Sequence, residues 1–404
     1  MTEVWASASV ADCLVPVPAA GKSKVQARDY KPSGRFPVID QGQEQIAGWT
    51  DDETAVIDAP LPLVVFGDHT RAFKFLDAPF ARGADGTQLL RPKADIDPLF
   101  FFYACRAIDL PARGYNRHFT VLKEKELSYP FDANEQKAVA GVLRKTESAL
   151  HQQTALLDNL QELKRAAMRE LFTRGLHGEA QKETEIGLVP ESWEVVTIND
   201  VALQTQYGLS LRGQPQGQLP ILRMNCQDDG RVVFRDLQYV DLDESSFAAF
   251  RLNDGDLLFN RTNSIEHVGR MAIYEGERDA VFASYLVRLT VDASRCLPRL
   301  LNYYMNRPEV QRDIKRLASR AVGQANINAS KLRTIEFPLP PTLDEQREIV
   351  AILDAIDRKI ALHRQKRAVL EELFQSLLHK LMTGEIRVAD LDLSALAQTP
   401  EVTA

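Results

Sequence analysis

The sequence predicts an α+β fold in which two similar, strand-rich mixed α/β domains alternate with two long helices. Three observations predict it: an internal repeat, two long stretches with helical hydrophobic periodicity, and runs of β-branched and aromatic residues between them. The chain has 404 residues, which favours two or three domains over one hydrophobic core. We expect the two helices to form an antiparallel coiled coil, with the two domains in a pseudo-twofold arrangement.

The internal repeat lies at the start of each helical stretch. PLPPTLDEQREIVAILDAID begins at Pro338, and a near-copy, YPFDANEQKAVAGVLRKTES, begins at Tyr129. A shift of 210 residues places the Glu-Gln pair at 135–136 on the pair at 345–346, and the alignment continues without a gap. Such self-similarity indicates that one structural unit occurs twice.

Local signals predict where each helix begins. Prolines precede both copies, and they disfavour helix upstream of them. Thr342, with a Glu three residues later, has the spacing of a capping box, and Asp132 repeats that spacing with Asp as the N-cap. We therefore predict helices over residues 132–173 and 342–383.

Apolar residues recur at spacings of three and four along both helices, which is typical of a buried seam between paired helices. Each helix would be roughly 63 Å long, so a parallel pair would force the linker and the second domain to bring the chain back over a similar distance. We therefore favour antiparallel pairing over two unrelated helices that each pack on their own domain. The residues predicted to pair the helices are Leu143, Leu150, Leu157, Leu160, Leu353, Ile356, Ile360, Leu370 and Phe374.

The segments between the helices correspond more loosely. FPVIDQG at 36–42 matches LPILRMN at 219–225, and LVVFGDHT at 63–70 matches DLLFNRTN at 256–263. We read these runs as mostly antiparallel strands, because Gly, Asp and Asn turns separate them. The predicted organisation is a first domain at 1–131, a helix at 132–173, a linker at 174–192, a second domain at 193–341, a helix at 342–383 and a tail at 384–404.

The sequence lacks the motifs of a catalytic or metal-binding protein. AAGKSK at 19–24 has Pro16 where a phosphate-binding loop needs its first glycine. The seven histidines and four scattered cysteines show no metal-ligand or disulfide spacing, which fits a reducing cytoplasm. No apolar run suits a membrane span, and the N-terminus does not resemble a signal peptide. We expect no catalytic site, metal, bound cofactor or membrane contact.

Polar side chains that suit base edges gather in turn-like segments of both domains. Arg fits the acceptor edge of guanine, and Asn or Gln fits adenine. Turn chemistry explains many such residues equally well, and the net charge of −7 leaves DNA binding to local patches such as the basic run at 301–337. The second-domain candidates are Arg223, Asn260, Arg261, Asn263, Ser264, His267, Gln324, Asn326 and Asn328. The first-domain candidates are Gln43, His69, Thr70, Arg71, Lys74, Arg113, Tyr115, Asn116 and Arg117.

Taken together, these segments resemble the specificity (S) subunit of type I restriction–modification systems. The resemblance is carried by LPPTLDEQREIVAILDAID with the later LMTGEI, by LVPESWEVVTINDVA, by GDLLFNRTNSIEHVG at 255–269 and by GQANIN at 323–328. GQEQIAGWTDD and VVFGDHTR are the better-matching pieces of the first domain. The first long helix departs from the family pattern, because PFDANEQ stands where a proline pair is usual.

The resemblance implies two target recognition domains, each of which reads one half of a bipartite asymmetric site in double-stranded DNA. It implies that the paired helices fix the spacer between the half-sites. It also implies two methyltransferase (M) subunits, which bind S-adenosylmethionine and methylate adenine N6, and motor–nuclease (R) subunits that use ATP and Mg. The outward face of the helices would dock the M subunits, and this chain would be a cytoplasmic, non-catalytic recognition subunit without a cofactor of its own.

Two other functions remain open from the sequence. One is a stand-alone sequence-specific DNA-binding protein without modification partners, which would bind its site tightly by itself. The other is a scaffold whose helices join other proteins without any DNA role. Co-purification with a methyltransferase separates the first from the S-subunit hypothesis, and salt-dependent DNA binding excludes the second.

Overall fold

The structure is a computed structural model that describes residues 5–18, 23–83, 86–111, 117–321 and 323–392. The chain divides into two compact units, one formed by residues 1–155 with 364–404 and the other by residues 156–363. Each long helix contributes one part to each unit. The units therefore do not follow the boundaries that the repeat suggested, because the helix segments share a core with the strands beside them.

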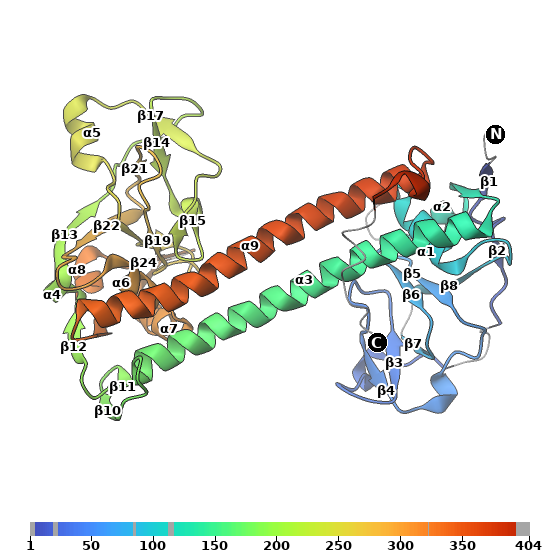
Figure 1. The fold of residues 1–404 in the computed structure, drawn as a ribbon, viewed down its shortest axis with the longest axis horizontal. Coiled ribbons are helices and arrows are strands. Elements are labelled where there is room, and N and C mark those ends of the chain that lie inside the picture. The colour runs from blue at the N-terminus through green and yellow to red at the C-terminus, as the bar shows by residue number, and fades with distance from the viewer. Residues whose placement is uncertain (1–4, 19–22, 84–85, 112–116, 322, 393–404) are drawn as a thin grey trace. The chain divides into compact units, whose positions relative to one another are not determined.

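The two longest elements are α3 (Ala133–Arg174) and α9 (Leu343–Met382) (Figure 1). Both begin at the predicted caps: an Asp132 carboxylate oxygen accepts from the Asn134 amide at 2.9 Å, and the Thr342 hydroxyl accepts from the Glu345 amide at 3.2 Å. In a capping box the Glu345 carboxylate would accept from the backbone amide of Thr342. Here it accepts from the indole N–H of Trp193 at 3.1 Å. The second cap thereby also holds the start of the second domain.

Within each unit the helix segments pack against each other and run antiparallel. Leu143 near the start of α3 shares a cluster with Phe374 near the end of α9, and Leu157 shares one with Ile360. The nine residues predicted to pair the helices are all buried or half-buried. Leu143, Leu353 and Phe374 also belong to domain cores, and Phe374 meets the ring of Tyr103 edge-on.

The first unit contains two main sheets. A four-stranded antiparallel sheet has the order β2-β8-β5-β6, and a three-stranded sheet has the order β4-β3-β7 with β3 and β7 parallel. β1 pairs antiparallel with β9 directly before α3. The elements are β1 (Trp5–Ser9), β2 (Leu14–Val15), η1 (Ala27–Asp29), β3 (Phe36–Ile39), β4 (Gly48–Thr50), η2 (Glu53–Ala55), β5 (Leu63–Gly67), β6 (Phe73–Leu76), β7 (Ala81–Arg82), β8 (Thr87–Pro92), α1 (Pro98–Ala107), α2 (Phe119–Lys123), β9 (Glu126–Pro130) and η4 (Val388–Asp390).

The second unit repeats this plan with additions. Its largest sheet has the order β13-β22-β18-β20-β16-β15, beside the sheets β17-β14-β21 and β19-β24-β23. β12 pairs with β25 directly before α9. The elements are β10 (Gln181–Thr184), β11 (Gly187–Pro190), β12 (Glu194–Thr197), α4 (Ile198–Val201), β13 (Ala202–Tyr207), β14 (Leu219–Leu222), η3 (Met224–Cys226), β15 (Gln227–Asp228), β16 (Arg231–Val232), β17 (Gln238–Val240), α5 (Glu244–Phe250), β18 (Leu257–Asn260), β19 (Thr262–Asn263), β20 (Met271–Ile273), β21 (Val281–Phe282), β22 (Leu286–Val291), α6 (Pro298–Met305), α7 (Pro308–Arg316), β23 (Ser319–Ala321), β24 (Gln324–Asn326), α8 (Ala329–Arg333) and β25 (Glu336–Leu339).

The two domains share one topology, as the repeat predicted. The run β2-β8-β5-β6 corresponds to β13-β22-β18-β20, and β4-β3-β7 corresponds to β17-β14-β21, including the parallel pair in each. A helix that opens with proline, α1 or α6, then packs on the sheet in each domain. The prediction of mostly antiparallel strands is confirmed.

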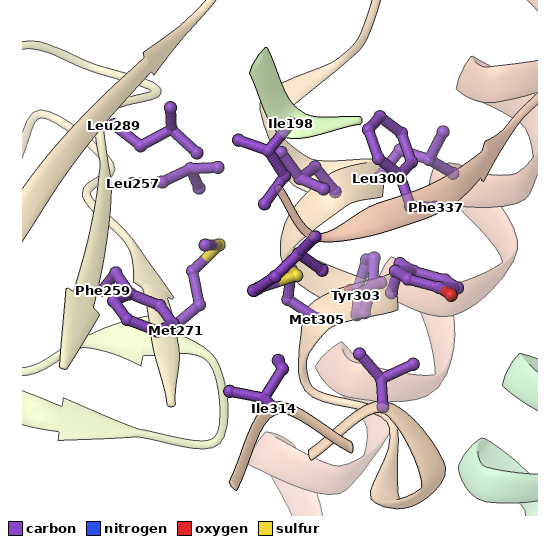
Figure 2. Packing of buried hydrophobic residues seen from close by; sticks show 14 of the residues in the cluster. Ile198, Leu257, Phe259, Met271, Leu289, Leu300, Tyr303, Met305, Ile314 and Phe337 are labelled. Atoms are coloured by element: carbon purple, nitrogen blue, oxygen red, sulfur yellow. The ribbon is translucent and has the colours of Figure 1, made fainter. Parts of the chain in front are cut away.

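Apolar side chains from the sheet and the helices fill each domain. Figure 2 shows Leu257, Phe259 and Met271 from the sheet facing Leu300 and Met305 from α6. All five side chains are almost completely buried. At roughly 1.5–3 kcal/mol for each fully buried large apolar side chain, this cluster is a main source of the domain's stability.

A polar contact joins each domain helix to a long helix, and we call this contact the joint. In the first unit the Tyr103 hydroxyl donates to Glu147 at 2.8 Å. In the second unit the Tyr303 hydroxyl lies 2.6 Å from Asp354 and 2.7 Å from Asp357. Burial raises the pKa of both tyrosines, so each remains a protonated donor.

The stretch predicted as a linker, residues 174–192, contains the antiparallel hairpin β10–β11. Gly187, which opens β11 directly after the turn, has a φ of +102°, a conformation that favours glycine. The Gln181 side-chain amide donates to the Thr173 carbonyl at 2.9 Å, which ties the hairpin to the end of α3. The predicted polar linker is thus folded locally as a hairpin, whose short strands carry few apolar residues and gave no strand signal in the sequence.

Candidate DNA interface

Arg261 directly follows the central strand β18 and is a candidate reader of the second domain. One terminal nitrogen of its guanidinium donates to the Ser284 carbonyl at 3.2 Å, and the group lies 4.8 Å from the Tyr207 ring centre. Its backbone amide donates to Tyr285, and its carbonyl accepts from Ile327. The residue is therefore held at both backbone and side chain.

The small sheet β19-β24-β23 brings two predicted segments together. Asn263 on β19 pairs with Ala325 on β24, and the Asn326 amide donates to the Thr262 hydroxyl at 2.7 Å. Gln324 is exposed on the same small sheet. NRTNS and GQANIN, which lie some sixty residues apart in the chain, thus form one surface beside Arg261.

Ser264 and His267 lie in the turn that follows β19. The Ser264 hydroxyl donates to Glu266 at 2.8 Å and lowers the pKa of that carboxyl group. His267 is exposed, and its backbone amide donates to the Ser264 carbonyl. The turn therefore presents both a carboxylate and an imidazole next to the small sheet.

Of the second-domain candidates, Asn260 is buried, and Asn328 and Arg223 also have structural roles. Asn260 is only 1% exposed at the end of β18, so it cannot reach a base. Asn328 caps α8 by accepting from the Lys331 amide, and Arg223 donates to the Asp236 carbonyl at 2.8 Å. The turn and cap preferences of Asn and the length of Arg explain these placements.

In the first domain, the β5–β6 hairpin presents the predicted readers. Arg71 has a φ of +62°, a strained backbone conformation for a residue with a side chain, and its guanidinium donates to the Leu110 carbonyl at 2.6 Å. The Thr70 hydroxyl donates to the Gln41 carbonyl, and Gln43 donates to the Thr70 carbonyl at 3.4 Å. Arg71 and Gln43 are both exposed.

Lys74 is the clearest incorrect prediction in the first domain. It is 2% exposed, its ammonium donates to the Asp40 carbonyl at 2.9 Å, and burial lowers its pKa. His69 is half-buried, and Arg117 is exposed. Arg113, Tyr115 and Asn116 lie outside the described residues, as do residues 19–22 of AAGKSK.

A cleft of 890 Å³ adjoins this hairpin within the first unit. Gln43, Thr70 and Arg71 line one side, and α1 and α3 line the other. Arg106 on that side stacks on Phe102 and pairs with Glu147. The cleft is therefore lined both by predicted reading residues of the first domain and by Tyr103 and Glu147, which form the joint.

The basic run at 301–337 is only partly available to an anion. Arg307 is 8% exposed and lies against the rings of Phe172 and Tyr304, and burial lowers its pKa. Lys331 donates to the Leu317 carbonyl at 2.8 Å. Arg312 and Arg316 on α7 are exposed and remain candidates for phosphate contacts, although Arg316 pairs with Asp313.

Neither a metal cluster nor a membrane helix occurs in the described ranges. No three His, Cys, Asp or Glu side chains there are grouped so as to hold an ion. None of the helices described combines the length and apolarity that a bilayer span requires.

Comparison with known proteins also indicates a role in type I restriction specificity. Residues 190–372 match the family model of the type I restriction modification DNA specificity domain. A Methanocaldococcus jannaschii protein, provisionally named the MjaX specificity subunit of a type I restriction enzyme, is 33% identical over 54% of this chain and 52% of its own length. The EcoKI specificity subunit of Escherichia coli K12 is 28% identical over 47% of this chain and 42% of its own length. The match thus spans about half of these relatives.

Solved structures extend the likeness along the chain. The crystal structure of a type I restriction–modification S subunit from M. genitalium is 16% identical, with a TM-score of 0.66 over 94% of this chain and 96% of that one. A chain from a structure of the type I R-M system is 18% identical, with a TM-score of 0.51 over 95% of this chain and 98% of that one. At these identities the likeness concerns the fold. Residues 190–372 thus match the DNA specificity domain of type I restriction–modification systems, and the chain is similar in sequence to specificity subunits of type I restriction enzymes and in fold to a solved S subunit.

Proposed function

We propose that this chain is the DNA-specificity subunit of a type I restriction–modification enzyme, in which each domain reads one half of a bipartite asymmetric site. The observation that carries the proposal is the duplication. Two domains of one topology each end in a strand that leads directly into a capped long helix. A single-site reader needs one such module, whereas a split site needs two.

Exposed or half-exposed polar side chains in both domains would contact the base edges. In the second domain these are Arg261, Asn263 and Gln324, and in the first they are Gln43 and Arg71. Arg and Gln or Asn match the major-groove edges of guanine and adenine. The exposed cations Arg117, Arg312 and Arg316 would contact phosphates, which position a protein without reading sequence.

The long helices would act as the spacer. A 40-residue α-helix rises about 60 Å, so a helix pair of this length can hold two domains at separate points on one duplex. The seam between the helices is apolar, and the joints fix each domain on its helix segment. The number of base pairs between the half-sites would follow from the helix length.

Catalysis would belong to partner subunits. Two M subunits would bring S-adenosylmethionine and methylate adenine N6, and R subunits would bring ATP and Mg, so that this chain binds none of them. Five apolar side chains on the long helices are at least 40% exposed, which suits docking of an M subunit: Leu163, Ile352, Leu362, Val369 and Leu373.

The test is co-expression of the chain with its methyltransferase partner, followed by mapping of methylated adenines in the host DNA. The expected result is one asymmetric split motif, together with co-purification of the M subunit. Tight, specific DNA binding by the isolated chain without any M subunit would favour the stand-alone DNA-binding function. Absence of salt-dependent DNA binding in the complex would exclude both.

A further inference from the structure

Tyr207 is the last residue of β13 and lies beside Arg261, although 54 positions separate them in the chain. Its ring is 43% exposed, and the Arg261 guanidinium carbon lies 4.8 Å from the ring centre. The Tyr207 hydroxyl accepts from the Ala329 amide at 3.0 Å, at the start of α8. The ring is thus fixed at its hydroxyl end and offers its face to the arginine.

The loop that supplies the second contact to Arg261 is also fixed. Leu209 donates to the Phe282 carbonyl at 2.8 Å, and Ser284 donates back to the Leu209 carbonyl at 2.9 Å. A Cβ on Gly208 would lie 2.4 Å from the carbonyl oxygens of Phe282 and Ala283, so only glycine permits this approach. The Ser284 carbonyl that receives the Arg261 side chain therefore has little freedom to move.

These contacts leave a defined set of donors on Arg261. Among the residues that the structure describes, the guanidinium donates only to Ser284, through one terminal nitrogen. Its Nε is buried without a hydrogen-bond partner. Because each terminal nitrogen carries two N–H groups, the second N–H of the nitrogen bonded to Ser284 and the N–H groups of the other terminal nitrogen remain for a ligand. The ring and the carbonyl set the plane in which these two nitrogens point. A guanidinium held in one plane suits the bidentate edge of guanine.

We propose that Tyr207 is a positioning residue for DNA specificity, which holds Arg261 so that it donates to O6 and N7 of one guanine in the half-site of the second domain. This inference rests on the proposed function and deepens it. Preorganisation matters because a free arginine side chain loses more conformational entropy on binding than one already stacked. The Tyr207 ring thereby contributes to selectivity without touching the base.

The test uses the complex of this chain with its methyltransferase subunit, after its site has been mapped. The half-site of the second domain is the one whose preference changes in Arg261→Ala. Duplexes then carry a single 7-deazaguanine, which lacks the N7 acceptor, at each guanine of that half. For the native chain we expect methylation to fall at least tenfold at one guanine.

The variants separate positioning from folding. Tyr207→Leu should reduce the discrimination at that guanine to less than threefold, with the first half-site read as before, and Tyr207→Phe should retain it. Tyr285→Leu is the matched control, because Tyr285 is also 43% exposed and meets Arg261 only through its backbone carbonyl. Full discrimination in Tyr207→Leu, equal loss in Tyr285→Leu, or equal loss at both half-sites would overturn the inference. Absence of any sequence preference in the native complex would instead overturn the proposed function.

Discussion

Gln136 and Gln346 lie 210 residues apart and make the same three hydrogen bonds in the two units. Gln136 accepts from the Asp97 amide and donates to the carbonyls of Asp95 and Pro130, at 2.6, 3.1 and 2.8 Å. Gln346 accepts from Leu297 and donates to Arg295 and Pro340, at 2.8, 2.9 and 3.4 Å. Each glutamine ties a domain helix, a closing strand and a long helix together at one buried point.

Replacement of either glutamine by methionine should destabilise its unit. Gln136 and Gln346 are 0% and 1% exposed, so their partners would lose hydrogen bonds without gaining water. We expect the free energy of unfolding to fall by about 2–4 kcal/mol in Gln136→Met or Gln346→Met, measured by urea denaturation. Gln365→Met, on the exposed surface of α9, is the control and should change it by less than about 0.5 kcal/mol. A similar small change in all three variants would contradict this account.

The helices and their starts could be predicted because their signals are local. Prolines, a capping residue and apolar spacings of three and four all lie within a few residues of the feature they specify. The seam residues Leu143, Leu157 and Ile360 are buried for the same reason. The repeat then predicted that the second domain copies the first.

Which polar side chains are exposed could not be predicted, because contacts distant in the sequence decide it. The sequence around Lys74 predicts a surface cation, but Lys74 lies on the buried face of β6, where its ammonium pairs with Asp40. Asn260 reads as part of a loop, yet it ends a buried strand. Tyr207 was missed altogether, since nothing near it in the sequence indicates that Arg261 lies against its ring.

Arg261→Ala should alter recognition in one half-site only. Loss of a bidentate contact to a base costs about 1–3 kcal/mol, so preference at one position should fall roughly 5- to 150-fold. Methylation-site mapping of the variant complex measures this directly. Arg312→Ala, an exposed cation on α7, is the comparison and should weaken binding similarly at all sequences while lowering the salt dependence. Equal relaxation at both half-sites in Arg261→Ala would argue against two independent reading domains.

The cysteines should be almost unreactive in the folded protein. Cys13, Cys105, Cys226 and Cys296 are all buried, and burial raises the pKa of each thiol, that of Cys296 to about 12. Because the thiolate is the nucleophile, a thiol-specific disulfide reagent at pH 8 should modify none of them within minutes, and all four after denaturation. Ser148→Cys, exposed on α3, provides the positive control for rapid labelling. Rapid modification of the native chain would show that a core opens more readily than its packing indicates.

Lengthening both long helices should change the spacer and leave both half-sites as they are. Insertion of four helix-forming residues after Ala155 in α3 and four after His363 in α9 places the additions where the chain passes between the two compact units. Four residues add about 6 Å, close to two base-pair steps of roughly 3.4 Å. We expect the mapped motif to keep its two halves and to gain one or two base pairs between them.

The control for that insertion puts the same four residues into the β10–β11 turn between Glu185 and Ile186. The turn lengthens the chain without lengthening either helix, so the spacer should stay unchanged. An insertion in α3 alone should instead abolish methylation, because the seam between Leu157 and Ile360 would lose its register. If the double insertion left the spacer unchanged while methylation continued, the helices would not determine the distance between half-sites, and the separation would have to be set by the partner subunits.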